Sequence, residues 1–175
     1  MDEVRLVGRN EQASRDLYLS VAPDLKSWSP DLTVLPGAFV ALLALDADAE
    51  DDETLEALAS RLMAAGCHYV CAWGPGCKRV HDTVDLIWNR ENPDPPTLPK
   101  RSSVYPSYAW DEAFVMTTAH DREPLDEALW FAVFNTYVDE HELSSVLALV
   151  SPPYAEHVER RFADSELLDR DVVGE

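Results

Sequence analysis

The chain has 175 residues, 46% of them hydrophobic, and a formal net charge of −19 at pH 7. This length suits one domain with a substantial core, and the composition is that of an ordinary globular protein. The negative charge argues against nucleic acid and anionic membranes as partners, because their phosphates attract Lys and Arg.

Sequence features that report on location predict a cytoplasmic protein. No stretch reaches 18 apolar residues, and the first twenty residues lack the hydrophobic core of a signal peptide. Three cysteines, Cys67, Cys71 and Cys77, cannot all pair within one chain, which favours a reducing compartment over a disulfide framework.

Residues 1–36 have no clear period and are punctuated by three prolines. We expect an extended lead-in that packs on the domain without being a domain itself. Its short apolar run, residues 17–19, is a candidate edge strand. The α/β domain is predicted to span residues 37–163.

The most readable stretch is a strand, helix, strand unit over residues 37–76. Residues 38–45 form an unbroken apolar run, as expected for a central parallel strand covered on both faces. Asp51 or Asp52 can cap the helix that follows, and Gly66 supplies the left-handed residue that ends it. Residues 68–73 form the second strand.

The remaining segments continue this alternation. In chain order we expect a helix over 77–88, a proline-rich connection over 89–112, a strand over 113–119, a helix from Pro124, a strand over 146–150, a helix over 154–162 and a frayed tail over 164–175. About four strand-helix units predict a single-domain α/β fold with an open, mainly parallel, Rossmann- or flavodoxin-like sheet and helices on both faces. Numbering the strands from residues 38–45, we predict the order 2-1-3-4.

The helix after Pro124 is unusually apolar. Besides its sheet-facing residues it carries Trp130, Phe131, Phe134 and Tyr137. Either the proline-rich connection covers these aromatic rings or a second protein does, and Trp130 is therefore a candidate binding residue.

Ligands of open α/β sheets bind beyond the carboxyl ends of the strands. The residues that this rule collects are Asp46, Asp48, Trp73, Gly74, Gly76, Cys77, Thr118, His120, Asp121 and Ser151. Glu123, just before Pro124, is a further candidate contact or a partner of the helix dipole.

Cys77 offers one possible chemistry. A thiol at a helix start has a lowered pKa, and His120 could act as its base, with Asp46 or Asp82 as the acid. The alternative is a small buried residue between turn and helix, which is the more common role of cysteine. Asp82 and Asp85 fit a solvated helix face.

Phosphate and metal sites find little support. Gly74 and Gly76 form a tight turn before a helix, yet neither the dinucleotide fingerprint nor the P-loop spacing is present. Cys71, Cys77 and His81 lack the paired cysteines of a zinc knuckle. We expect no metal and no cofactor.

Two segments resemble a known family. They are GC-x-Y-x-x-AWG-x-x-C-x-x-x-x-D-x-x-D at residues 66–85 and FVMTT-x-H-x-x-EPL-x-E-x-x-WF at residues 114–131. Both are similar to those of an uncharacterised bacterial family, a domain of unknown function. The resemblance implies a bacterial origin and a shared α/β domain, and it implies no activity.

No segment matches a reaction-specific motif, so the sequence does not decide whether the protein is an enzyme. The dense acids of residues 46–56 are either a solvated face or a docking surface for a basic partner. We expect a partner- or ligand-binding domain, for example an acidic immunity protein for a basic toxin, whose charge speeds association. A small molecule is the other candidate partner. The alternative function is a hydrolase or transferase with a Cys/His/acid site.

Overall fold

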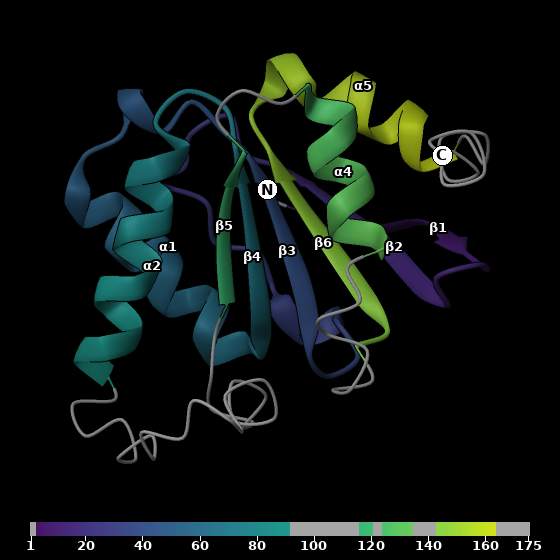
Figure 1. Ribbon diagram of the computed structural model, residues 1–175, viewed down its shortest axis with the longest axis horizontal. Coiled ribbons are helices and arrows are strands. Elements are labelled where there is room, and N and C mark those ends of the chain that lie inside the picture. The colour runs from purple at the N-terminus through teal and green to yellow at the C-terminus, as the bar shows by residue number, and fades with distance from the viewer. Residues whose placement is uncertain (1–2, 92–115, 121–123, 135–142, 164–175) are drawn as a thin grey trace, which may run out of the picture.

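The computed structural model describes residues 3–91, 116–120, 124–134 and 143–163. One six-stranded sheet in the order β1-β2-β6-β3-β4-β5 carries helices on both faces (Figure 1). The strands are β1 Arg5–Asn10, β2 Arg15–Val21, β3 Phe39–Ala44, β4 Cys67–Trp73, β5 Met116–His120 and β6 Ser145–Val150. The helices are α1 Asp52–Ala65, α2 Cys77–Glu91, α4 Leu125–Phe134 and α5 Pro152–Ala163, with short 3-10 turns η1 Leu32–Val34 and η2 Ala47–Ala49. None of these helices is long and apolar enough to cross a bilayer.

The central strand is β3, as its apolar run predicts. It pairs in parallel with β4 on one side and with β6 on the other, and all six of its residues are buried. β2 and β5 add further parallel strands, and among the described strands only β1 runs antiparallel. The mixed α/β architecture with a mostly parallel sheet is therefore confirmed.

The predicted strand order is wrong. The strand after the second helix, β5, pairs with β4, so the chain moves outward from β3 through β4 to β5. The next strand, β6, then returns to the free edge of β3. Right-handed crossovers that step in opposite directions place their helices on opposite faces of a sheet. Numbered in the same way, β5-β4-β3-β6 reads 3-2-1-4, as in the first four strands of the Rossmann order, but β2 and β1 continue the sheet beyond β6, so the complete order is neither that of Rossmann nor that of flavodoxin.

Two hydrophobic clusters lie on the two faces of the sheet. Phe39, Ala41 and Leu43 of β3 face the cluster that α1 and α2 complete. The alternate residues of β3 face the cluster that α4 and α5 complete. Because β3 is covered on both faces, its residues need no polar alternation.

Both ends of α1 follow the sequence prediction. The Asp51 carboxylate accepts a hydrogen bond from the backbone N–H of Thr54 at 2.7 Å and caps the helix. Gly66 ends it in the left-handed conformation, with φ of 103°.

The predicted lead-in contributes two strands to the sheet. Residues 17–19 lie within β2, which is an interior strand between β1 and β6, so their predicted edge position is wrong. The segment after β2 packs against α1 through Trp28, which is 2% exposed. Its indole Nε1 donates to Ser20 Oγ at 3.0 Å, and the Arg61 guanidinium lies 5.6 Å from its ring centroid.

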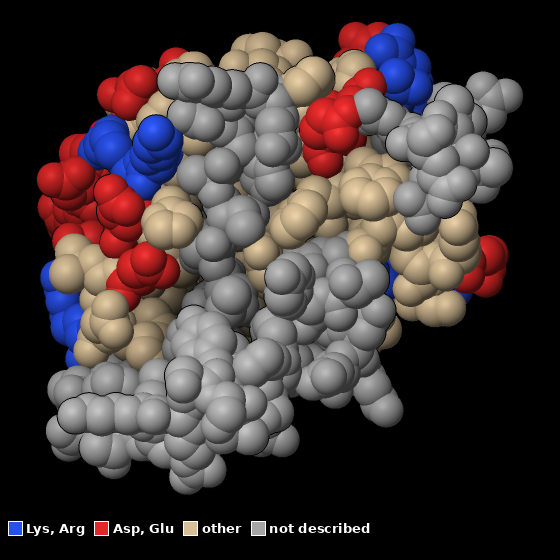
Figure 2. Space-filling view, in the orientation of Figure 1, with Lys and Arg blue, Asp and Glu red and all other residues tan. Residues whose placement is uncertain are grey.

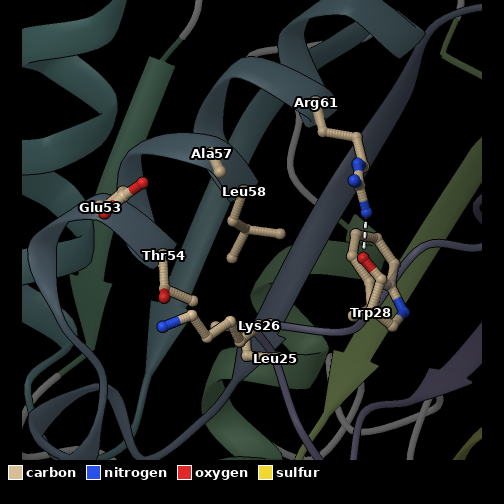
Figure 3. Close-up of a pocket in the computed structure, with 8 residues that line it drawn as sticks. All are labelled: Leu25, Lys26, Trp28, Glu53, Thr54, Ala57, Leu58 and Arg61. Carbon is tan, nitrogen blue, oxygen red and sulfur yellow. Dashed lines mark hydrogen bonds between the residues drawn. The ribbon is translucent and has the colours of Figure 1, made fainter.

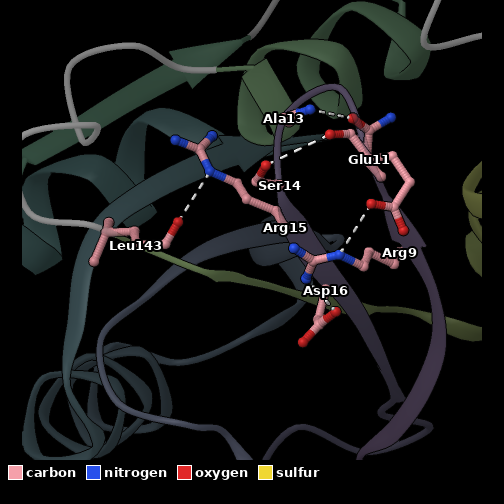
Figure 4. A network of polar contacts seen from close by, with 8 residues as sticks. Arg9, Glu11, Ala13, Ser14, Arg15, Asp16 and Leu143 are labelled. Atoms are coloured by element: carbon pink, nitrogen blue, oxygen red, sulfur yellow. Dashed lines mark hydrogen bonds and ion pairs between the residues drawn. The ribbon is translucent and has the colours of Figure 1, made fainter.

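A buried arginine connects the first hairpin to α4 and to the residues just before β6. Arg15, at the start of β2, is 2% exposed, and its Nε donates to the carbonyl of Leu143 at 3.2 Å (Figure 4). Its Nη1 donates to the carbonyl of Val133, in the last turn of α4. A cation at this end of a helix also interacts favourably with the helix dipole.

We predict that Arg15→Leu lowers the free energy of unfolding by about 2–4 kcal/mol, because it leaves buried carbonyl groups without donors. Urea unfolding measures the loss. Arg9→Leu in the same hairpin is the control, since Arg9 is exposed and pairs with Asp16 at the surface. Equal stability of the two variants would contradict the role given to Arg15.

Candidate functional site

A pocket of about 520 Å³ opens at the carboxyl ends of β3 and β4. We call it the carboxyl-edge pocket, and its lining consists of Asp48 and the continuous run Trp73, Gly74, Pro75, Gly76, Cys77, Lys78 and Arg79. Five of these residues are candidates from the sequence: Asp48, Trp73, Gly74, Gly76 and Cys77. The structure brings them together through the loop after β3 and the turn into α2.

Two glycines allow these loops to approach each other. A Cβ on Gly74 would lie 2.2 Å from the carbonyl oxygen of Leu45, and one on Gly76 would lie 2.7 Å from both N and Oδ1 of Asp48. Both glycines also have positive φ, of 106° and 77°. The Gly-Pro-Gly turn therefore meets a backbone requirement that side chains cannot meet.

Arg79 fastens the pocket wall. Its Nη1 donates to the carbonyl of Ala47 at 2.6 Å, and its Nη2 donates to Asp52 Oδ1 at 2.7 Å. The backbone N–H of Ala47 in turn donates to the carbonyl of Pro75 at 2.8 Å. These bonds fix the loop after β3 against the start of α2, so the pocket is preformed.

Trp73 connects the pocket to the opposite face of the sheet. Its ring meets Tyr154 of α5 edge-on, with the centroids 5.0 Å apart. The register of β4 and β5 sets Trp73 opposite His120 at the carboxyl edge. Two other sequence candidates, Asp121 and Glu123, lie outside the described residues.

The cysteines are embedded in the core. Cys77 is 3% exposed and belongs to the cluster formed with α1 and α2. Burial raises the pKa of the Cys67 thiol to about 12, and backbone hydrogen bonds from Tyr69 and Ala41 offset only part of this shift. The described residues contain no group of three or more His, Cys, Asp or Glu side chains placed to hold a metal.

The two candidate acids lie apart from the carboxyl-edge pocket lining. Asp82 is exposed on α2, where its carboxylate faces His81 Nδ1 at 3.3 Å. Asp46 is exposed just after β3. Neither lines the pocket, whereas Asp48 does.

The apolar helix of the sequence prediction is α4. Trp130 is half-buried and stacks on Phe134 with centroids 5.4 Å apart, and Phe131 packs against Tyr69 of β4 at 5.8 Å. Trp130 lines neither of the two pockets described here. Tyr137 lies outside the described residues.

A second, smaller pocket of about 180 Å³ lies between the lead-in and α1 (Figure 3). We call it the Trp28 pocket, and it is lined by Leu25, Lys26, Trp28, Glu53, Thr54, Ala57, Leu58 and Arg61. Sequence reasoning missed it, because three of its eight lining residues come from the lead-in, which has no readable period. A tryptophan between two prolines was the available signal.

The acidic run of residues 46–56 is partly neutralised within the molecule. Asp51, Asp52 and Glu56 face Lys26, Arg79 and Arg90 at 3.7, 2.7 and 3.4 Å. Figure 2 shows such mixed charges over the side of the molecule that α1 and α2 form in Figure 1.

Glu50, within this run, lies in a different environment. Burial raises the pKa of the Glu50 carboxyl, and the charges of Asp24, Asp51 and Asp46 raise it further, while Lys26 opposes them. In addition to burial, the charges of these three acids therefore repel the ionised Glu50 carboxylate in the folded state.

A polar cluster that the sequence did not reveal joins α4 to α5. The Asp126 carboxylate contacts His157 Nε2 at 2.6 Å and accepts a hydrogen bond from Arg161 Nη2 at 2.8 Å. Burial raises the pKa of Asp126, but the hydrogen bonds from His157 and Arg161 outweigh it and leave the pKa below its usual value. Arg160 faces the other ring nitrogen of His157 at 3.2 Å. Every nitrogen of this imidazole thus has a partner, as expected for a link between helices.

Together these features define an α/β domain with a preformed pocket at the carboxyl edge of a mostly parallel sheet. The chain belongs to the family described as a domain of unknown function (DUF7684), whose model matches residues 17–164. This match confirms the resemblance seen in the sequence. No curated protein and no solved structure matches the chain.

We predict that Gly74→Ala destabilises the fold more than Gly37→Ala. Both glycines have positive φ, so left-handed strain of about 1–2 kcal/mol is common to the two variants. Gly37 has open space around its would-be Cβ, whereas that of Gly74 would collide with the Leu45 carbonyl. Chemical denaturation measures the difference, and equal losses would show that the close approach has no energetic role.

Proposed function

We propose that this chain is a binding domain that takes a small ligand with a charged group in the carboxyl-edge pocket. The observation that carries the proposal is the convergence of Asp48, Trp73 and the Gly74–Cys77 turn around about 520 Å³. This volume lies within the range of about 300–1,000 Å³ that is typical of small-molecule sites. The pocket lies beyond the carboxyl ends of the strands, as the rule for open α/β sheets expects, on the β4 side of β3, while the strand order reverses on its β6 side.

The lining indicates the kind of ligand. Trp73 offers an apolar ring, and Lys78 and Asp48 offer charges of opposite sign on two sides. Arg79 is already committed to Ala47 and Asp52. A ligand with a flat apolar part and one charged group fits these walls, and Lys78 favours an anionic group.

Binding has more support than the alternative hydrolase or transferase chemistry. A nucleophilic thiol must reach its substrate, and Cys77 is 3% exposed within an apolar cluster. The candidate acids Asp46 and Asp82 do not line the same pocket. Three buried free cysteines also support the proposed cytoplasmic location.

A charged-fragment screen by NMR tests the ligand proposal. We expect anionic aromatic fragments to shift the backbone amide signals of Gly74 and Gly76. Lys78→Gln should weaken these hits about tenfold, since it removes one of the two cations that line the pocket, the other being Arg79. Lys26→Gln is the matched control, because Lys26 lines the other pocket. Hits that bind Lys78→Gln and wild type equally, or a screen without shifts at residues 73–79, would overturn the proposal.

A second candidate function is docking of a basic protein, and the surroundings of Glu50 favour it. Three acids, Asp24, Asp46 and Asp51, act on the Glu50 carboxyl through their charges. Lys26 is the one cation among the charges found to act on it. Basic side chains of a partner would relieve this repulsion and would also speed association.

Substituting Glu50 tests whether its burial and the neighbouring negative charges destabilise the ionised carboxylate in the folded state. A carboxyl whose pKa is raised by folding destabilises the folded state above that pKa, and the cost vanishes below its unfolded value of about 4.3. Glu50→Gln should therefore raise Tm at pH 7 and lose this gain near pH 4. Solvent screening keeps the gain within about 1 kcal/mol.

The control for this experiment is Glu53→Gln. Glu53 lies in the first turn of α1, where a negative charge interacts favourably with the helix dipole, so its removal should slightly lower Tm at pH 7. A Glu50→Gln variant that is no more stable than Glu53→Gln would remove the support for a basic partner.

A further inference from the structure

We propose that the Trp28 pocket is an anchor site for one apolar side chain of a basic protein segment. The inference rests on the second proposed function for the charge of the partner and adds the place where that partner binds. It has three supports: the shape and chemistry of the pocket, its rigidity, and the charges around it.

The pocket has an apolar floor and a polar rim. Leu25, Trp28, Thr54 and Leu58 form the floor and are each less than 9% exposed. Lys26, Glu53, Ala57 and Arg61 are exposed and form the rim. In Figure 3, Leu58 points into the space between Thr54 on one side and Trp28 on the other. Such a lining suits an apolar group that enters from solvent.

The size of the pocket selects a single side chain. Its volume of about 180 Å³ is below the usual range for small-molecule sites. A buried apolar cavity of about 150 Å³ holds a benzene molecule, which is close to the size of a leucine or phenylalanine side chain. Interface hot spots commonly consist of one apolar or aromatic anchor in a pocket of this kind.

Hydrogen bonds within the protein hold the Trp28 side of the pocket in place without a partner. Trp28 Nε1 is bonded to Ser20, and the backbone carbonyl of Trp28 accepts a hydrogen bond from Arg61. Arg61 also lies over the Trp28 ring, so its cation is engaged on the pocket's own wall. A preformed pocket reduces the entropy lost on binding.

The surroundings of the pocket carry net negative charge. Lys26 belongs to the rim, and its Nζ lies 3.7 Å from Asp51. The charges that act on Glu50 include Lys26 itself together with Asp24, Asp51 and Asp46, so this acidic cluster borders the rim. The lining itself holds two cations, Lys26 and Arg61, and one acid, Glu53, whereas the four acids beyond it, Asp24, Asp46, Glu50 and Asp51, act together with Lys26 and leave the surroundings net negative. A segment with basic residues beside its apolar anchor complements this pattern, whereas a second copy of this chain brings a charge of −19.

Synthetic peptides provide the test. The probe is a fluorescein-labelled heptapeptide with leucine between two flanks of three lysine or arginine residues. One twin has serine in place of leucine, and another has leucine between glutamate flanks. We expect the basic leucine peptide to bind about 10- to 100-fold more tightly than the serine twin, because a buried leucine contributes that much to affinity. The acidic peptide should not bind.

Two alanines of α1 give matched variants. Ala57→Phe fills the pocket from its rim and should reduce the leucine-to-serine ratio to about one. Ala64→Phe adds the same ring at an exposed position away from the pocket and should leave the ratio unchanged. Circular dichroism and Tm confirm that both variants fold. The double variant Asp24→Asn, Glu50→Gln should weaken both basic peptides by the same factor.

Each failure identifies its cause. If both basic peptides bind equally, or if Ala57→Phe keeps the ratio, the anchor is wrong while docking of a basic partner stands. If the acidic peptide binds as well as the basic one, the charge proposal is wrong while the pocket stands. If none binds at millimolar concentration, both are wrong. A dimer that sedimentation detects in wild type and that Ala57→Phe abolishes would show that the occupant is a second copy.

Discussion

The fold depends on the burial of β3 on both faces and along both edges. A strand in this position can satisfy its backbone groups only through neighbouring strands, so β4 and β6 must both pair with it. Its side chains need apolar partners above and below, and α1 and α2 supply them on one face and α4 on the other. Polar side chains are thereby largely excluded from the middle of the sheet and lie at the two ends of its strands, as Arg15 does at the start of β2, and on its outer helices.

The two pockets occupy different positions relative to this sheet. The carboxyl-edge pocket forms where loops leave β3 and β4, and its geometry comes from backbone approach at Gly74 and Gly76. The Trp28 pocket lies outside the sheet, between α1 and the segment that follows β2. Each therefore has its own structural cause, and loss of one need not disturb the other. The two proposed binding events therefore need not compete for the same surface.

The sequence predicted the local features well, because they depend on nearby residues. The buried run of β3, the Asp51 cap and the end of α1 at Gly66 each follow from the chemistry of a few neighbours. The convergence of Asp48 with the Trp73–Cys77 turn followed from a rule about strand ends. The predicted strand order was wrong because it depends on pairing between residues that are far apart in the chain, such as Phe39 and Ser145. Arg15 contacts residues 118 and 128 positions away, and Asp126 contacts His157, which is 31 positions away. No periodic pattern in the sequence marks such pairs.

The position of β6 has a consequence for how the chain assembles. Its six residues pair with Asp16–Val21 on one side and with Phe39–Ala44 on the other, so the last strand of the sheet separates two strands made much earlier. During synthesis the first hairpin has no parallel neighbour, and β3 keeps one open edge, until Ser145–Val150 leaves the ribosome. Such non-local pairing is slow to form and leaves strand edges exposed meanwhile. The protein therefore completes its sheet by insertion of β6, and until then the first hairpin and the strands β3 to β5 share no strand pairing.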